Sequence, residues 1–301
     1  MQKNDHHTLK IYTINHIGTP INSRERSLEF YQQVLGLTVI PHQIEGNRLV
    51  WTKTNDGTMV HLIDPPINSS DKPSFHVALE VHDLNPVINI LRKHHIETIG
   101  EPGIRHDGQQ YLFIFDPEGN RIEITTKSNQ NPNSRLVDQY GNTHDTDKNI
   151  ERNSALKSEW KTVDPKRSLN IITIDHVGLP IIDRKRTLPF YRDVLGLTLI
   201  PAMEHGDALI WMQTLDGTMI HLIEGAPISH TAFRVQDFDR ALSITMEMGI
   251  EIIKGPLERL DGQKAFYCYD PDGNRLEFTS SRWLKQPVAP RSVNCCGFTT
   301  Q

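Results

Sequence analysis

The stretch INHIGTPINSRERSLEFYQQVLGLTVIP at residues 14–41 recurs without a gap as IDHVGLPIIDRKRTLPFYRDVLGLTLIP at residues 174–201. Three further pairs follow in the same order: DGTMVHLI at 56–63 with DGTMIHLI at 216–223, HVALEV at 76–81 with HTAFRV at 230–235, and DPEGNRIEIT at 116–125 with DPDGNRLEFT at 270–279. A chain of 301 residues is long enough for two ordinary domains, each with its own core. The duplication therefore predicts two copies of one unit.

Four residues of metal-ligand type are kept in both copies, although many of their neighbours differ. Imidazole and carboxylate groups are the usual protein ligands of iron, zinc, nickel and manganese. A lone histidine is more often a hydrogen-bonded core or surface residue. The retention of a whole set in both copies favours a metal site instead. The candidate ligands are His16, His61, His76 and Glu123 in the first copy, and His176, His221, His230 and Glu277 in the second.

The composition narrows the class of protein. The formal net charge is −5, with acidic and basic residues interspersed, so no basic stripe is available for a nucleic-acid backbone. The polar start MQKNDHHTLK contains no apolar signal core, and no apolar run reaches the roughly 18 residues of a transmembrane helix. Three cysteines make neither a disulfide framework nor a zinc spacing. These features predict a cytoplasmic protein with no nucleic-acid or membrane partner.

Within each copy the apolar pattern predicts a strand, a helix and three strands, and then the same order again. In the first copy we expect strands at 12–18, 38–43, 48–54, 58–63 and 75–81, and three more strands after the second helix, the last of them at 122–126. We expect helices at 23–35, with Ser23 as N-cap and Gly36 as C-terminal stop, and at 84–94, capped by Asp83. The expected boundaries are a disordered N-terminus at 1–10, domains at 11–127 and 169–283, a polar linker at 128–168 with a short helix near 150–160, and a loop-like tail at 284–301.

The alternation of side chains along a strand indicates which candidates share a face. In the last strand Ile122 and Ile124 form the apolar side, which places Glu123 on the opposite side. In the strand that begins at His76, Val77 and its alternate neighbours are apolar, so His76 also points away from the helices. The strands of His16 and His61 are apolar on both faces, so the alternation does not indicate on which face these two histidines lie. Two imidazoles and a carboxylate on one face are the ligand set of a 2-His-1-carboxylate iron site.

The repeated motifs H-[IV]-G-x-P, L-x-F-Y-x-x-V-L-G-L, D-G-T-M-[VI]-H-L-I, H-x-A-[LF] and D-P-[ED]-G-N-R-[IL]-E resemble those of the vicinal oxygen chelate superfamily. This superfamily includes glyoxalase I, fosfomycin-resistance enzymes, methylmalonyl-CoA epimerase, bleomycin-resistance proteins and extradiol dioxygenases. The resemblance covers nearly all of both copies. It implies an α+β fold of two tandem domains, each made of paired β-α-β-β-β units that form a curved mixed sheet around one divalent metal ion.

The resemblance also implies roles for individual residues. Carried over position by position, the metal ligands are His16, His76 and Glu123, and then His176, His230 and Glu277. His61 and His221 stand where glyoxalase I has a ligating, catalytic glutamate, so they are expected as additional ligands. Tyr267 matches the tyrosine of extradiol dioxygenases that orients or protonates substrate. The histidine of that signature is replaced by Leu260 in the second copy, whereas the first copy has His106 but Phe113 in place of the tyrosine.

Three functions follow from this resemblance. The first is an Fe(II) dioxygenase of extradiol type, with a small substrate that chelates the metal through adjacent oxygens and with Tyr267 or His106 assisting proton transfer. The second is a lyase or isomerase of glyoxalase or epimerase type, with Ni(II), Zn(II) or Mn(II) as Lewis acid. The third is a non-catalytic protein that binds a drug or metabolite. The ligands can pair within a copy or across copies, and the chain is expected as a monomeric fused pseudo-dimer or as a homodimer.

Overall fold

The computed structural model describes residues 8–40, 49–64, 75–105, 108–127, 136–137, 143–144, 164, 166–201 and 208–281. The first half begins with strand β1 (Ile14–Pro20), helix α1 (Arg24–Glu29) and a π-helical turn η1 (Phe30–Val34). Strands β2 (Thr38–Ile40), β3 (Leu49–Lys53) and β4 (Met59–Ile63) complete its first unit. The second unit comprises β5 (His76–Val81), α2 (Asn85–Lys93), β6 (Gly103–Ile104), β7 (Gln110–Phe115) and β8 (Arg121–Thr126).

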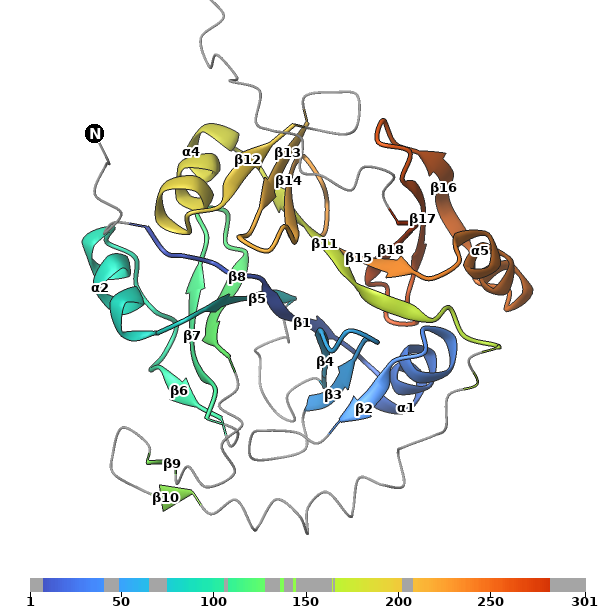
Figure 1. The fold of residues 1–301 in the computed structure, drawn as a ribbon, viewed down its shortest axis with the longest axis horizontal. Coiled ribbons are helices and arrows are strands. Elements are labelled where there is room, and N and C mark those ends of the chain that lie inside the picture. The colour runs from blue at the N-terminus through green and yellow to red at the C-terminus, as the bar shows by residue number, and fades with distance from the viewer. Residues whose placement is uncertain are drawn as a thin grey trace, which may run out of the picture.

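The second half repeats this order (Figure 1). Its first unit comprises β11 (Ile171–Ile181), α4 (Arg184–Pro189), η3 (Phe190–Val194), β12 (Thr198–Ile200), β13 (Leu209–Gln213) and β14 (Met219–Glu224). Its second unit comprises β15 (His230–Val235), α5 (Phe238–Glu247), β16 (Ile252–Glu258), β17 (Lys264–Tyr269) and β18 (Arg275–Thr279). Two short strands, β9 (Leu136–Val137) and β10 (Thr143–His144), pair with each other between the halves.

Each half forms one curved sheet of eight strands. The strand order is β2-β3-β4-β1-β5-β8-β7-β6 in the first half and β12-β13-β14-β11-β15-β18-β17-β16 in the second. In each unit the first strand pairs in parallel with the last, as β1 does with β4 and β5 with β8. The two units meet where β1 and β5 run antiparallel. The predicted α+β fold of paired β-α-β-β-β units in a mixed sheet is confirmed.

The first helix of the first half differs from its prediction. A single helix was expected at 23–35, but α1 ends at Glu29 and continues as the π-helical turn η1. Ser23 stands at the N-cap position without a capping side-chain bond, whereas Asp183, at the equivalent position in the second half, accepts hydrogen bonds from the backbone N–H groups of Lys185 and Arg186. A carboxylate is the stronger acceptor at a helix N-terminus, because it also interacts favourably with the helix dipole.

The halves contact each other through reciprocal hydrogen bonds. The Tyr31 hydroxyl of η1 donates to Asp270 Oδ2 at 2.9 Å, and the Tyr191 hydroxyl of η3 donates to Asp116 Oδ2 at 2.9 Å. All four residues are buried, and the buried apolar residues of both halves form one connected cluster. The two aspartates begin the tight turns that lead into β18 and β8, so the first helical segment of each half supports a turn of the other.

The D-G-T turns make a second reciprocal contact. The backbone N–H of Asp56 donates to the carbonyl of Ile172 at 3.0 Å, and that of Asp216 donates to the carbonyl of Tyr12 at 2.9 Å. Glycine follows each aspartate with a φ of +97° or +90°, a left-handed conformation that a residue with a Cβ rarely adopts. This geometry explains why D-G-T is kept in both halves although it contributes no metal-ligand candidate.

The expected helix near 150–160, His106, most of the expected N-terminal segment and the whole of the expected tail lie outside the described residues. Among the helices that the structure describes, none combines the length and the apolar character needed to cross a membrane.

Candidate metal centre

The first half gathers His16, His76 and Glu123 from three neighbouring strands, β1, β5 and β8. His16 Nε2 lies 3.2 Å from Glu123 Oε2, and His76 Nε2 lies 3.6 Å from the same oxygen. All three side chains are buried, and one potential ligand atom from each lies within 4.8 Å of the other two. The pairing takes place within the half, so the alternative in which ligands pair across halves is not what the structure contains.

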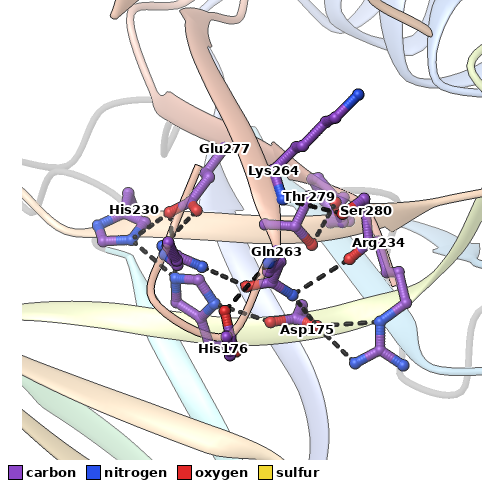
Figure 2. Close-up of polar contacts among 12 residues, drawn as sticks. Asp175, His176, His230, Arg234, Gln263, Lys264, Glu277, Thr279 and Ser280 are labelled. Atoms are coloured by element: carbon purple, nitrogen blue, oxygen red, sulfur yellow. Dashed lines mark hydrogen bonds and ion pairs between the residues drawn. The ribbon is translucent and has the colours of Figure 1, made fainter. Parts of the chain in front are cut away.

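The second half repeats the arrangement with His176, His230 and Glu277 (Figure 2). Glu277 Oε2 lies 3.1 Å from His176 Nε2 and 3.3 Å from His230 Nε2, and the two Nε2 atoms are 3.3 Å apart. Ligand atoms bound about 2.1 Å from one metal ion lie about 3.0 Å apart at a right angle and about 3.4 Å apart at a tetrahedral angle. The observed separations therefore fit a single transition-metal ion held on one side.

A glycine of the H-[IV]-G-x-P motif makes room for each cluster. Gly18 lies opposite His76 in the β1–β5 ladder, and Gly178 lies opposite His230 in the β11–β15 ladder. A Cβ at either glycine would stand 1.9 Å from Cε1 of the facing imidazole. The ring can lie across the neighbouring strand only because that strand has no side chain at this position.

The glutamate of each cluster contacts a buried arginine that was not predicted from the sequence. Arg105 Nη1 lies 2.8 Å from Glu123 Oε1, and Arg259 Nη2 donates to Glu277 Oε1 at 2.6 Å. Both arginines are only 5% exposed, and this burial identifies them as part of the site instead of surface charges. Because Oε1 is held by the arginine, Oε2 is the oxygen directed at the histidines. The repeated pattern R-x-D-G-Q at 105–109 and 259–263 was the available signal.

The electrostatics of the first cluster favour the protonation states that a metal needs. Burial lowers the pKa of His76 to about 3, and burial also lowers the pKa of His16 despite the nearby Glu123. Burial acting by itself would raise the pKa of Glu123, but the charges of His16 and Arg105 lower it overall. At neutral pH the first cluster therefore presents neutral imidazoles and a carboxylate, which is the ligand set of a divalent cation.

The second cluster differs in the direction in which the pKa of its first histidine is shifted. Burial would lower the pKa of His176, but Glu277 and a hydrogen bond to Asp175 together raise it. His16 has Asn15 at the equivalent place. The two clusters thus share their geometry and differ in the charge next to one imidazole.

His61 and His221, expected as fourth ligands, lie beside the clusters. The ring of His61 stacks between His16, at a centroid distance of 4.0 Å, and Trp51, at 3.9 Å. In the second half His221 lies in the same way between His176 and Trp211. Neither belongs to the groups whose ligand atoms lie within 4.8 Å of one another. Burial lowers the pKa of both well below 6.5, so both are neutral bases.

The candidate catalytic residue Tyr267 lies on β17, directly opposite Glu277. Its ring is 6.1 Å from that of His230, and its side chain is buried. Phe113 is paired with Glu123 in the same way in the first half, with its ring 5.6 Å from that of His76. A phenol therefore lies next to one cluster and an apolar ring next to the other.

The fold and these clusters agree with the comparisons to known proteins. The model of the Glyoxalase/Bleomycin resistance protein/Dioxygenase superfamily matches residues 13–124 and 173–278, and the chain belongs to this superfamily. Among curated proteins it is similar to the catechol-2,3-dioxygenase of Bacillus subtilis, with 28% identity over 206 residues, which cover 63% of this chain and 68% of that protein.

Two solved structures have a similar fold at low sequence identity. The 2,3-dioxygenase LapB from Pseudomonas sp. KL28 aligns with a TM-score of 0.64 and 18% identity, covering 95% of this chain and 97% of that one. The Mn(II)-bound glyoxalase from Novosphingobium aromaticivorans aligns with a TM-score of 0.66 and 18% identity, covering 90% and 83%. Proteins with this fold thus include both a dioxygenase and a glyoxalase.

Proposed function

We propose that the chain is a metal-dependent enzyme with one divalent ion in each half, and that it acts on a small substrate with two adjacent oxygens. The ligands would be the Nε2 atoms of His16 and His76 with Glu123 Oε2, and the matching atoms of His176, His230 and Glu277. The observation that carries the proposal is the presence, in both halves, of two buried imidazoles and one carboxylate oxygen converging at 3.1–3.6 Å.

We favour Fe(II) and a ring-cleaving dioxygenase reaction at the second site. The chemistry that Fe(II) supplies in a 2-His-1-carboxylate set is the binding of substrate oxygens and dioxygen at its open positions. The curated match to a catechol-2,3-dioxygenase extends over 206 residues, more than either half contains. Tyr267, the residue of the dioxygenase resemblance, lies beside this cluster and not beside the first.

The residues around the second cluster suit an ionised substrate. The guanidinium of Arg275 lies 4.7 Å from the ring centre of Tyr267, and its Nε is buried without a hydrogen-bond partner among the described residues. A cation in this position favours the anionic form of a substrate hydroxyl, while the Tyr267 phenol can donate a hydrogen bond to it or hold its proton. Lys254, 5.2 Å from the same ring, adds a second positive charge.

The test begins with metal analysis of protein purified without oxygen. We expect about two irons per chain, with Glu123→Ala and Glu277→Ala each losing one. Oxygen uptake with a series of catechols should disappear with Glu277→Ala and persist with Glu123→Ala. Tyr267→Phe should lower turnover about 100-fold while leaving the iron content unchanged, because it removes a proton donor and no ligand. Phe113→Tyr is the matched control in the first half. Protein that neither retains nor takes up metal would refute the proposal.

A lyase or isomerase of glyoxalase type is the second candidate, and the buried histidines beside the clusters support it. Nε2 of His61 and of His221 is buried and has no hydrogen-bond partner in the described part of the chain. A neutral imidazole in that position can accept a proton from a carbon acid. The two candidates differ in their need for oxygen. Conversion of a hemithioacetal under strictly anaerobic conditions, abolished by His221→Phe with metal content retained, would favour this reaction over ring cleavage.

A further inference from the structure

We propose that the two sites differ in metal affinity. The reason is the hydrogen-bond acceptor of the first histidine of each site, which is an amide for His16 and a carboxylate for His176. This inference rests on metal binding at both clusters, as proposed above. It adds that the second site binds a divalent ion more tightly, and it assigns Asn15 and Asp175 as the positioning residues responsible.

The two hydrogen bonds have the same geometry. His16 Nδ1 lies 2.9 Å from Asn15 Oδ1, and His176 Nδ1 lies 3.1 Å from Asp175 Oδ1. In both halves Nε2 faces the glutamate, so a metal ligand at Nε2 requires the proton on Nδ1, where it is donated to the oxygen. The amide of Asn15 is oriented by its other end, because Nδ2 donates to Glu80 Oε2 at 2.7 Å. The acceptor of this hydrogen bond is therefore an amide oxygen in the first half and a carboxylate oxygen in the second.

A second residue has changed together with the acceptor. Asp175 accepts two hydrogen bonds from Arg234, at 3.0 Å from Nε and 2.5 Å from Nη2, and both contacts are drawn in Figure 2. Arg234 and Glu80 occupy equivalent positions in HTAFRV and HVALEV. The amide in the first half is therefore held by an anion, and the carboxylate in the second half is held by a cation. Asn15 with Glu80, and Asp175 with Arg234, are each hydrogen-bonded to each other, so each pair can be transferred to the other half as a double substitution.

The remaining surroundings of the two imidazoles are matched. The buried arginines Arg105 and Arg259 contact the ligand glutamates in both halves, and His61 and His221 stack on the two imidazoles at 4.0 and 3.9 Å. These shared contacts cannot make the sites unequal. Tyr267 and Phe113 also differ between the sites, but they lie beside the other histidine of each cluster, whereas the change of acceptor acts directly on His16 and His176.

A carboxylate acceptor increases the basicity of a ligating imidazole more than an amide does, because the hydrogen bond is assisted by charge. The side chain of Asp175 has no exposed surface, so water does not screen this bond. Glu80 also carries a negative charge, but it reaches His16 only through the neutral Asn15 and is half-buried. Loss of such an outer partner typically costs 10–100-fold in metal affinity. We therefore expect the second site to bind about 10–100-fold more tightly.

The experiment measures each site separately with Co(II), whose visible spectrum reports the ligand field. Metal-free Glu277→Ala protein retains only the first site, and Glu123→Ala retains only the second. Titration against a competing chelator should give a dissociation constant about 10–100-fold lower for the second site. Exchanging the pairs should reverse the order: Asn15→Asp with Glu80→Arg tightens the first site, and Asp175→Asn with Arg234→Glu weakens the second.

A gain of affinity at the first site, with a shift of its Co(II) bands toward those of the second, cannot result from misfolding. Near-ultraviolet circular dichroism of each variant checks the fold. Equal Co(II) affinities at the two sites, or double substitutions that change neither affinity, would overturn this inference. The proposal that both sites bind metal would remain. If neither site binds Co(II), both this inference and the proposed function fail.

Discussion

Replacing Arg259 by Met should destabilise the metal-free protein far more than the metal-loaded protein. Arg259 Nη2 contacts Glu277 Oε1 at 2.6 Å, and both side chains are at most 1% exposed. Breaking a buried ion pair by removing one partner typically costs about 3–5 kcal/mol, because the other charge is left without compensation. The two histidines still contact the second oxygen of Glu277, so we expect the lower end, about 3 kcal/mol.

A metal ion at the cluster would itself supply the missing positive charge. In the loaded protein we expect a loss of only about 1 kcal/mol, from the hydrogen bond that Arg259 Nη1 makes to Gln263. By thermodynamic linkage the difference of about 2 kcal/mol must appear as roughly 30-fold tighter metal binding in the variant. If Arg259 instead served mainly to position Glu277 for the metal, the variant would bind metal more weakly.

The assay is urea unfolding of wild type and Arg259→Met, each without metal and with saturating Co(II), together with chelator competition. Arg105→Met should show the same signs in the first half. Arg24→Met is the control, because its ion pair with Asp64 is partly exposed and should contribute under about 1 kcal/mol. Equal losses with and without Co(II), or weaker Co(II) binding by the variant, would refute the reasoning.

Three further predictions concern packing and protonation. Gly178→Ala should reduce the metal content by one ion per chain in elemental analysis, because the new Cβ would stand 1.9 Å from Cε1 of His230; unchanged content would contradict this. Tyr31→Phe should lower the free energy of unfolding at pH 8 by about 1–3 kcal/mol, since a buried hydrogen bond to Asp270 is lost. Burial and Asp270 raise the pKa of Tyr31 well above 10, so its contribution is present below pH 10 and is lost as pH rises toward the folded-state pKa; wild type should therefore lose stability faster than the variant in urea unfolding above pH 10. Burial raises the pKa of the Cys268 thiol to about 12, so iodoacetamide at pH 8 should label it, by peptide mass mapping, only after unfolding.

The sequence was sufficient for the fold because the duplication made its pattern visible twice. Alternation along the strands correctly put Ile122 and Ile124 in the core and left Glu123 on the other face, with the histidines. The sequence did not decide whether ligands pair within or across the halves. That choice depends on the antiparallel contact of β1 with β5, whose register places Gly18 opposite His76. Strand order is a long-range property that local patterns do not contain.

The arginines and the residues beside the ligand candidates could not be predicted from the sequence for a different reason. Arg105 lies 18 positions before Glu123, and the hairpin of β7 and β8 brings it back to the cluster. Its type suggested a surface charge, because arginine is seldom buried without a partner. Asn15 directly precedes His16, and on a regular strand neighbours point to opposite faces. The β1–β5 register shifts between Ile14 and His16, and with this irregularity the Asn15 side chain reaches His16 Nδ1.

The contacts between halves give a physical reason for keeping both copies in one chain. Each cluster is built from strands of its own sheet, but the turn that leads to its glutamate is held by a tyrosine of the other half, at 2.9 Å in both cases. The D-G-T turns are likewise bonded to the first strand segments of the opposite copy. A half separated from its partner would lose the tyrosine donor to Asp116 or Asp270 and would expose apolar surface of the shared core. The duplication can therefore diverge in the residues around each histidine–glutamate cluster, as Asn15 and Asp175 have done, while the tyrosine–aspartate contacts between the halves are kept.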